Sequence, residues 1–122
     1  MILDIGCRSN KRADIGIDIV ILRTVDVTAS ATHLPFRSNV FERAVSYECI
    51  GYDSGPDDVI SALNEGLRVA VTVDIYMWNE PMMLKELLDV PHETKKGAYL
   101  PLWYQEEADI DRDFFCRFRY VR

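Results

Sequence analysis

Short apolar runs separated by polar segments make up the first part of the chain. Four of these runs are rich in β-branched residues and have the length of β-strands, and they cover residues 1–5, 15–20, 24–28 and 41–47. The segments between the runs are too short to hold full helices. The pattern therefore predicts four strands in succession before the first helix.

A helical period begins near Pro56, in a position that suits a first helical turn. Apolar residues then recur at helical spacing, and these are Val59, Ile60, Leu63 and Leu67. The other face of the predicted helix is polar, with Asn64, Glu65 and Arg68. A β-branched stretch over 69–77 follows directly and predicts a central strand that is buried on both faces.

The last third of the chain predicts one more helix and two strands. Residues 80–88 have a helical pattern that Pro91 ends. Strands over 98–104 and 114–121 are expected to pair as a hairpin, with the acidic stretch 106–113 between them.

This element order predicts a single α/β domain over 1–122, with a mostly parallel sheet and a C-terminal antiparallel hairpin. Helices are few for such a sheet. Either the first helices of a larger fold are reduced or missing, or another chain covers one face of the sheet.

Composition and charge narrow the class of protein. The chain has 122 residues, of which 48% are hydrophobic and 28% charged, as in an ordinary folded domain. Acidic residues outnumber basic residues by 20 to 14, for a net charge of −6. This field repels phosphate backbones, so nucleic acid is not an expected partner, although a local basic patch is compatible with it.

The cysteines and the apolar runs indicate an intracellular setting. Cys7, Cys49 and Cys116 are odd in number and far apart, which argues against a disulfide scaffold or a zinc ribbon, and no metal site is expected. No apolar run reaches the roughly 18–20 residues that a membrane helix needs. The N-terminus lacks the pattern of a signal peptide. We expect a cytoplasmic protein with no membrane partner.

Candidate ligand-binding residues follow the strands, because open α/β sheets bind ligands beyond the carboxyl ends of their strands. Gly6 ends the first strand and lets a ligand approach the backbone closely. Asp18 ends the second strand, where a carboxylate suits the two hydroxyls of a ribose. The segments after the third and fourth strands add Ser30, Ala31, Thr32, Glu48 and Cys49.

Four segments in this order resemble class I S-adenosylmethionine-dependent methyltransferases. Residues 2–7 (ILDIGC) are similar to the first motif of that family, and 16–18 (GID) to the strand that ends in its ribose-binding acid. The stretch 33–46, with its LPF sequence, is similar to the segment before the fourth strand. Residues 62–69 (ALNEGLRV) resemble the helix before the fifth strand, which carries an E-x-x-R pattern.

The resemblance implies a Rossmann-like, three-layer fold and S-adenosylmethionine as cofactor. It implies that Asp4 organises the amides of the first loop and that Asp18 binds the ribose. Lys11 matches a lysine of the subgroup with a short first loop. The cofactor-binding residues expected from it are Asp4, Gly6, Cys7, Asp18, Ile19, Ser30, Ala31 and Thr32.

Two positions depart from the family pattern. Arg8 replaces the second glycine of the first loop, and its side chain would either block the amino-acid tail of the cofactor or pair with its carboxylate. Blocking is the favoured outcome. Ser30 replaces an aspartate that contacts the adenine amine, and a serine accepts that bond more weakly.

Two functional hypotheses follow. The first is a methyltransferase that acts on an unknown substrate, expected to be a small molecule. The second is a catalytically inactive methyltransferase-like binding or scaffold subunit. This second hypothesis rests on Arg8, on Ser30, and on a chain that starts directly at its first strand. It expects a homodimer, with the aromatic stretch 99–104 as a candidate surface.

No catalytic residue can be assigned from a motif. Glu48, Asp53 and His33 are candidates for a general base by position alone, and a loop role is favoured for His33. The arginines of the last strand, Arg117, Arg119 and Arg122, are expected to form a solvated face that discourages edge pairing.

Overall fold

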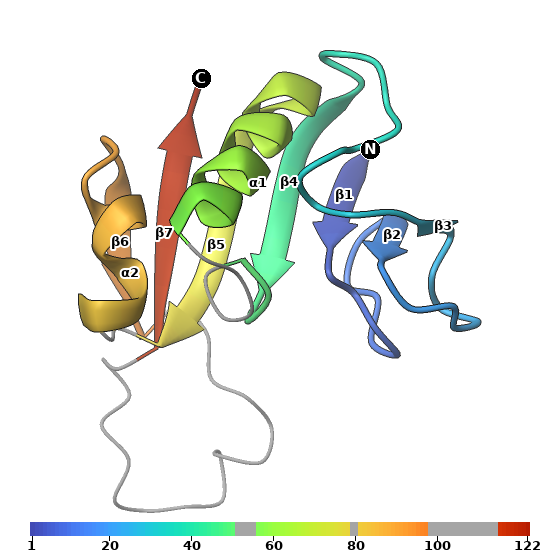
Figure 1. Cartoon of the computed structure of the whole chain (residues 1–122), viewed down its shortest axis with the longest axis horizontal. Coiled ribbons are helices and arrows are strands. Elements are labelled where there is room, and N and C mark those ends of the chain that lie inside the picture. Colours follow the sequence, from blue (N-terminus) through green and yellow to red (C-terminus); the bar gives the residue numbers. More distant parts are fainter. Residues whose placement is uncertain (51–55, 79–80, 98–114) are drawn as a thin grey trace, which may run out of the picture.

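The computed structural model describes residues 1–50, 56–78, 81–97 and 115–122 (Figure 1). Strands and short connections make up the N-terminal part, as the pattern predicts. The described elements, in chain order, are β1 (Ile2–Ile5), β2 (Ile15–Asp18), β3 (Val27–Thr28), β4 (Phe41–Tyr47), α1 (Pro56–Val69), β5 (Ala70–Trp78), α2 (Pro81–Leu88), β6 (Glu93–Lys96) and β7 (Phe115–Val121).

The strands form one mixed sheet in the order β3-β2-β1-β4-β5-β7-β6. The pairs among β1 to β5 are parallel, and β7 pairs antiparallel with both β5 and β6. Of the described strands, β7 alone therefore runs against the others. The predicted α/β class, with a mostly parallel sheet and antiparallel pairing at its C-terminal end, is confirmed.

Both described helices lie on the same face of the sheet (Figure 1). Helix α1 packs closely on β5, because a Cβ atom at Gly66 would lie 2.9 Å from Cγ2 of Val73. Helix α2 joins the same layer through Leu87, whose carbonyl accepts a hydrogen bond of 2.6 Å from the buried Tyr120 hydroxyl. The core between helices and sheet is aliphatic and aromatic, and includes Leu3, Ile5, Ala44, Leu63, Ile75 and Phe118.

The opposite face of the sheet carries polar groups where it meets no described helix. The register places Asp4, Val45, Asp74 and Arg119 side by side on this face. The Arg119 guanidinium donates two hydrogen bonds, of 2.8 and 2.9 Å, to the fully buried Asp74 carboxylate. Tyr47 and Tyr76 also stack on this face, with ring centroids 4.5 Å apart. The described part of the chain therefore shows one helical layer. This agrees with the expectation that the first helices are reduced or missing, but it gives a sheet covered by helices on one face and not the three layers that the family resemblance implies.

Two sequence-based expectations about the last strand are corrected by this packing. Arg119 does not lie on a solvated face, because it neutralises Asp74. Arg117 has a side chain only 16% exposed and lies 3.6 Å from Glu93. The charge alternation along β7 therefore reflects a polar sheet face and not an edge facing water.

The predicted elements match the structure closely between β1 and α2. Strand β4 and helix α1 occupy the predicted residues, while β2 and β3 are shorter than predicted. The sequence pattern missed β6, because all four of its residues are exposed and none is apolar. The predicted strand at 98–104, with the aromatic stretch proposed as a dimer surface, and the acidic stretch 106–113 lie outside the described residues. Within the described part of the chain, neither helix is long and apolar enough to cross a bilayer.

Candidate functional site

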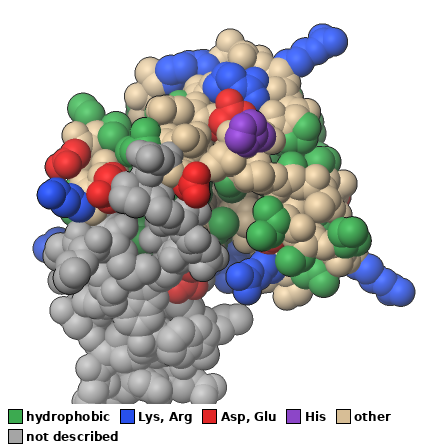
Figure 2. Space-filling model, viewed as in Figure 1, with side chains coloured by type: hydrophobic (Ala, Val, Ile, Leu, Met, Phe, Trp, Pro, Cys, Tyr) green, Lys and Arg blue, Asp and Glu red, His purple; other side chains and the backbone are tan. Residues whose placement is uncertain are grey.

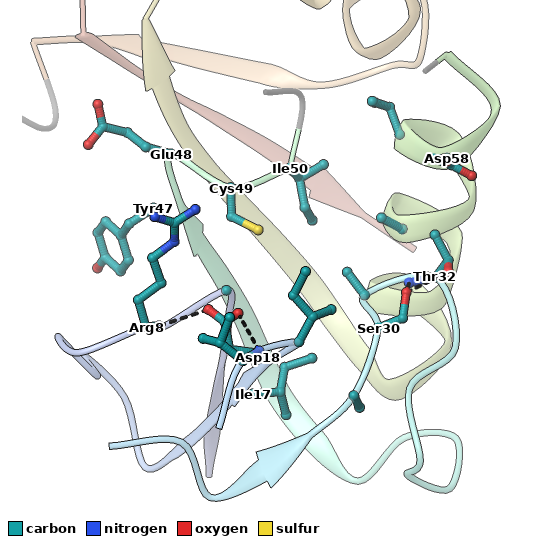
Figure 3. Close-up of a pocket in the computed structure, with 17 residues that line it drawn as sticks. Arg8, Ile17, Asp18, Ser30, Thr32, Tyr47, Glu48, Cys49, Ile50 and Asp58 are labelled. Carbon is teal, nitrogen blue, oxygen red and sulfur yellow. Dashed lines mark hydrogen bonds between the residues drawn. The ribbon is translucent and has the colours of Figure 1, made fainter. Parts of the chain in front are cut away.

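A cleft of about 670 Å³ opens at the carboxyl ends of the parallel strands (Figure 3). Its walls come from the segments that follow β1, β2, β3 and β4 and from the start of α1. This is the edge where open α/β sheets place their ligands, and the volume is in the usual range for small-molecule sites. A smaller hollow of about 220 Å³ adjoins it and shares Gly6, Arg8, Tyr47 and Glu48 in its lining.

Gly6 makes the turn that closes β1 and brings it against β2. Its φ of 77° lies in the left-handed region that favours glycine. The amides of Gly6 and Cys7 both donate to the carbonyl of Ile17, at 2.9 and 3.0 Å. A Cβ atom at position 6 would lie 2.2 Å from Sγ of Cys49. Both the backbone and the packing therefore require glycine here.

Asp18 closes β2 and binds the two loops beside it. One carboxylate oxygen accepts a hydrogen bond of 3.0 Å from the Arg8 amide, and the other accepts one of 3.2 Å from the Val20 amide. The residue is 8% exposed and lines the cleft. Because each carboxylate oxygen has two lone pairs, Asp18 keeps acceptor capacity for a pair of ligand hydroxyls.

Arg8 has a backbone role that the sequence does not reveal. Its φ of 45° is unusual for a residue with a side chain, and it turns the amide toward Asp18. The side chain extends along one wall of the cleft, from Asp18 toward Tyr47 and Cys49 (Figure 3). The cleft keeps its volume with Arg8 in its lining, and the guanidinium forms no hydrogen bond or ion pair with any other described residue.

Asp4 is a buried carboxylate in the smaller hollow. It is 1% exposed, and its Oδ2 accepts a hydrogen bond of 2.8 Å from the Arg12 amide, a contact of the kind expected of a residue that organises the first loop. Its Oδ1 has no hydrogen-bond partner among the residues that the structure describes. Burial raises the pKa of this carboxyl above its ordinary value, although the bond from Arg12 opposes the shift.

The segment after β3 forms the wall opposite Arg8 (Figure 3). The Ala29 amide donates to the carbonyl of Asp18 at 2.9 Å, which fixes this segment next to β2. The Ser30 and Thr32 hydroxyls lie 2.8 Å apart, and Thr32 also lies 2.9 Å from Nδ1 of His33. Six of the predicted cofactor residues thus line the cleft, namely Gly6, Asp18, Ile19, Ser30, Ala31 and Thr32. Asp4 and Cys7 line the adjoining hollow.

Two residues of α1 hold the segment that follows this wall. Oε2 of Glu65 accepts a hydrogen bond of 2.8 Å from the Leu34 amide. The Arg68 guanidinium donates to the carbonyls of Leu34 and Phe36, at 2.9 and 2.8 Å, and is bound to Glu65 at 2.7 Å. The LPF segment and the E-x-x-R pattern of the helix are therefore two halves of one contact.

Three residues were proposed as a general base from their position in the chain, and the structure describes two of them, His33 and Glu48. His33 lies outside the lining of both cavities. Glu48 lines both, but its carboxylate points away from Asp18 (Figure 3), and its φ is 54°. Asp53 lies outside the described residues. Burial raises the pKa of the Cys7 thiol, so this cysteine is held protonated and is not an activated nucleophile.

Sequence reasoning missed several residues of the cleft. Ile50, Val59 and Ala62 are apolar residues of its lining, and Asp58 lines it from the start of α1. Tyr47 forms part of the wall, with its phenol pKa raised by burial. The position of these residues in the chain could have indicated them, because α1 starts at the sheet edge at which β4 ends. No group of three metal-ligating side chains occurs among the residues that the structure describes.

The fold and the cleft define a mixed α/β protein with a ligand-sized cavity at the carboxyl edge of its sheet. No family model and no curated protein matches the chain. Among solved structures, it is similar over 99% of its length to protein 1320 of Thermoplasma acidophilum, with 77% of that chain covered, a TM-score of 0.58 and 10% identity.

The PH0226 protein from Pyrococcus horikoshii OT3 has the same fold. The match covers 96% of this chain and 64% of that one, with a TM-score of 0.53 and 17% identity. The chain therefore spans less than two-thirds of the Pyrococcus protein. At these identities the likeness establishes the fold, and neither name states an activity.

Proposed function

We propose that the chain binds S-adenosylmethionine and is a small methyltransferase of the class I type. The observation that carries the proposal is the convergence of separate segments on one cleft. Gly6, Asp18 and the 30–32 turn are separated by 12 residues or more in sequence, and they line one cleft at the carboxyl edge of the sheet. The family resemblance implies cofactor-binding roles for these same residues. The antiparallel β7 agrees with the sheet ending of that family.

The larger cavity suits the adenosine part of the cofactor. Asp18, itself 8% exposed, offers free lone pairs for a ribose diol. Ile19 and Ala31 supply apolar contacts for an adenine ring, and the Ser30 and Thr32 hydroxyls supply hydrogen-bonding groups at its edge.

The smaller hollow suits the amino-acid end. The buried Oδ1 of Asp4 lacks a partner and would accept a hydrogen bond from an α-ammonium group. Arg8 lines both cavities, so its guanidinium is a nearby cation for an α-carboxylate. This fit favours pairing with the cofactor over the blocking role that the sequence alone favoured for Arg8.

Methyl transfer from S-adenosylmethionine requires little chemistry from the side chains of the protein. S-adenosylmethionine supplies a methyl group already activated by its sulfonium. The residues of this chain would bind and align it, and Ile17, Ile50 and Val59 would exclude water from the cleft. Because Glu48 points away from the centre, we assign no general base, and the expected acceptor is a nucleophile that needs none.

Calorimetric titration with S-adenosylmethionine and S-adenosylhomocysteine tests the proposal. The wild-type chain should bind both, and Asp18→Asn should weaken binding by about 10-fold or more, since one charge-assisted hydrogen bond is worth about 1.5–3 kcal/mol. Asp89→Asn makes the same chemical change at an exposed position after α2 and should leave binding unchanged. The absence of heat and of a thermal shift with either ligand at millimolar concentration would refute the proposal.

A second candidate is a methyltransferase-like subunit that has lost catalysis and works as a scaffold. It is favoured by the Cys49 side chain packed against Gly6, and by the presence of Arg8 where the family has glycine. It predicts weak or absent cofactor binding together with a stable homodimer in analytical ultracentrifugation. A monomer that binds the cofactor tightly would eliminate it.

A further inference from the structure

Four consecutive aliphatic side chains are exposed immediately after β2. Ile19 is 74% exposed, Val20 43%, Ile21 87% and Leu22 43%. We call these residues, 19–22, the apolar loop. Figure 2 shows hydrophobic side chains gathered at the lower right, where Figure 1 places the loops that follow β1 and β2, with basic side chains on either side. A contiguous apolar patch of this kind usually marks an interaction site.

The loop is held in place and is not a frayed end. The Val20 amide is bound to Asp18 at its start, and the Val25 amide donates to the Leu22 carbonyl at 3.0 Å to close a turn. Farther along, Asp26 accepts from the Gly16 amide at 2.8 Å. The backbone is held at both ends of the apolar loop while its side chains are exposed, so the exposure is a feature of the folded structure.

Cations flank the apolar loop on both sides. Arg23 follows it directly, and Arg8 lies across the cleft mouth, tied to this region by a hydrogen bond from the Thr24 hydroxyl to its carbonyl. Both side chains are exposed, and neither guanidinium is bound to another described residue. Lys11 is exposed as well, but it is paired with Asp26 at 3.1 Å. The surface around the loop is thus locally basic on a chain whose net charge is −6.

We infer that the apolar loop, with Arg8 and Arg23 beside it, docks the protein on an anionic lipid surface. A loop that inserts aliphatic tips while arginines contact anionic headgroups combines the two attractions that hold peripheral proteins on membranes. Such docking needs no spanning helix. It departs from the sequence-based expectation of no membrane partner, which rested on the absence of a long apolar run and of a signal peptide.

A protein partner fits this patch less well. Four aliphatic side chains make a patch on the order of a few hundred Å², whereas a stable protein interface buries about 800 Å² on each partner. Protein interface cores are enriched in aromatic residues and methionine, and the apolar loop contains neither. The experiment must therefore distinguish binding to lipid from binding to a second copy of the chain.

Docking would bring the cleft to the lipid surface. Ile19 and Val20 belong both to the apolar loop and to the lining of the cleft, so the two features are continuous. The inference rests mainly on Ile21, Leu22 and Arg23, which lie outside the lining of both cavities, so it holds whichever ligand the cleft binds. Arg8 contributes to lipid contact only when no ligand in the cleft is paired with its guanidinium.

Vesicle co-sedimentation of the full chain tests the inference. The vesicles are phosphatidylcholine alone, or phosphatidylcholine with about one-third phosphatidylglycerol. We expect binding to the anionic vesicles that falls with added salt, and little binding to the neutral ones. Ile21→Glu, at a position outside the cleft lining, should lower the partition coefficient by about 10-fold or more. Arg23→Gln should lower it about fivefold.

Val121→Glu is the matched control. Val121 is 64% exposed and ends β7, which runs antiparallel to the strands whose ends form the cleft, so it lies at the opposite end of the sheet. This variant should bind like the wild type. Equal binding to neutral and anionic vesicles, no binding to either, or no effect of Ile21→Glu would overturn the inference. A change in sedimentation coefficient caused by Ile21→Glu without vesicles would overturn it in favour of self-association.

Discussion

The buried ion pair between β5 and β7 gives the sharpest test of how this fold is held together. The Asp74 carboxylate is fully buried, and Arg119 binds both of its oxygens, at 2.8 and 2.9 Å. Arg43 is the second cation, with its Nε 3.5 Å from Oδ2. Replacing Arg119 with methionine keeps most of the side-chain volume and removes both short hydrogen bonds.

The expected cost follows from the burial of the partner. Removing one side of a buried pair costs about 3–5 kcal/mol, because a charge is left in a low-dielectric setting. Here Arg43 remains near the carboxylate, and the Arg119 side chain is 30% exposed, so the expected cost falls to the lower end of that range or just below it. We therefore expect Arg119→Met to lower the free energy of unfolding by about 2–3 kcal/mol.

Urea denaturation followed by circular dichroism measures this difference. Arg37→Met makes the same chemical change at an exposed position and should fall within about 0.5 kcal/mol of wild type. In the double variant Asp74→Leu/Arg119→Met the uncompensated charge is gone, so most of the lost stability should return. If Arg119→Met matches Arg37→Met, or if the double variant is no better than the single one, the loss is not due to a stranded buried carboxylate.

Two further predictions concern the turn at β1 and the contact between α1 and the LPF segment. Gly6→Ala should cost about 1–2 kcal/mol from its positive φ alone, plus the clash with Cys49, so Gly6→Ala/Cys49→Ala should recover part of the loss in the same unfolding assay. The hydrogen bond from Arg68 holds the pKa of Glu65 below its ordinary value of 4.5. The ionised Glu65 carboxylate therefore stabilises the fold above pH 4.5, and this stabilisation is lost as the pH falls through the lowered pKa. The stability difference between wild type and Glu65→Gln should therefore be largest near pH 7 and shrink below pH 4.5, and a difference that stays constant down to pH 3 would contradict this account.

The local sequence pattern predicted those elements whose position depends on the apolar periodicity of the segment itself. Strand β4 and helix α1 occupy the predicted residues, because the apolar period in each segment agrees with the face that it buries. Strand β6 was missed for the opposite reason. Its sequence Glu-Thr-Lys-Lys has no apolar residue, and it forms only because β7 offers it a free edge. Long-range pairing made this strand, and no local signal indicates it.

Charged side chains were harder to place than apolar ones. A charge on a strand usually faces water, and the arginines of β7 were assigned accordingly. The structure pairs Arg119 with Asp74, a residue 45 positions away whose carboxylate lies inside a predicted buried strand. The sequence shows a lone carboxylate in an apolar strand and an arginine on a later strand. They can be recognised as an ion pair only when the strand order is known.

The LPF segment and the E-x-x-R pattern show the same limit. Each was visible in the sequence as a separate point of resemblance. In the structure Glu65 and Arg68 bind the backbone of Leu34 and Phe36 across 31 to 34 positions, which fixes the exit of the 30–32 turn. Their contribution to the cleft is indirect, since they hold the segment that carries Ser30 and Thr32.

The strongest argument that the cleft is functional is that unfavourable backbone conformations and an unpaired buried oxygen are found around it. Apart from glycines, the described residues with positive φ are Arg8, Asn39 and Glu48. Asn39 is a residue type that tolerates this conformation in turns, but Arg8 and Glu48 have no such tendency, and both line the cleft and the adjoining hollow. Asp4, with a buried oxygen that lacks a partner, lies in the same hollow. Strained backbone and an unsatisfied buried carboxylate each cost stability, and such features cluster at active sites and ligand-binding sites. This concentration at one sheet edge is what a binding site for a polar ligand with a cationic end would require.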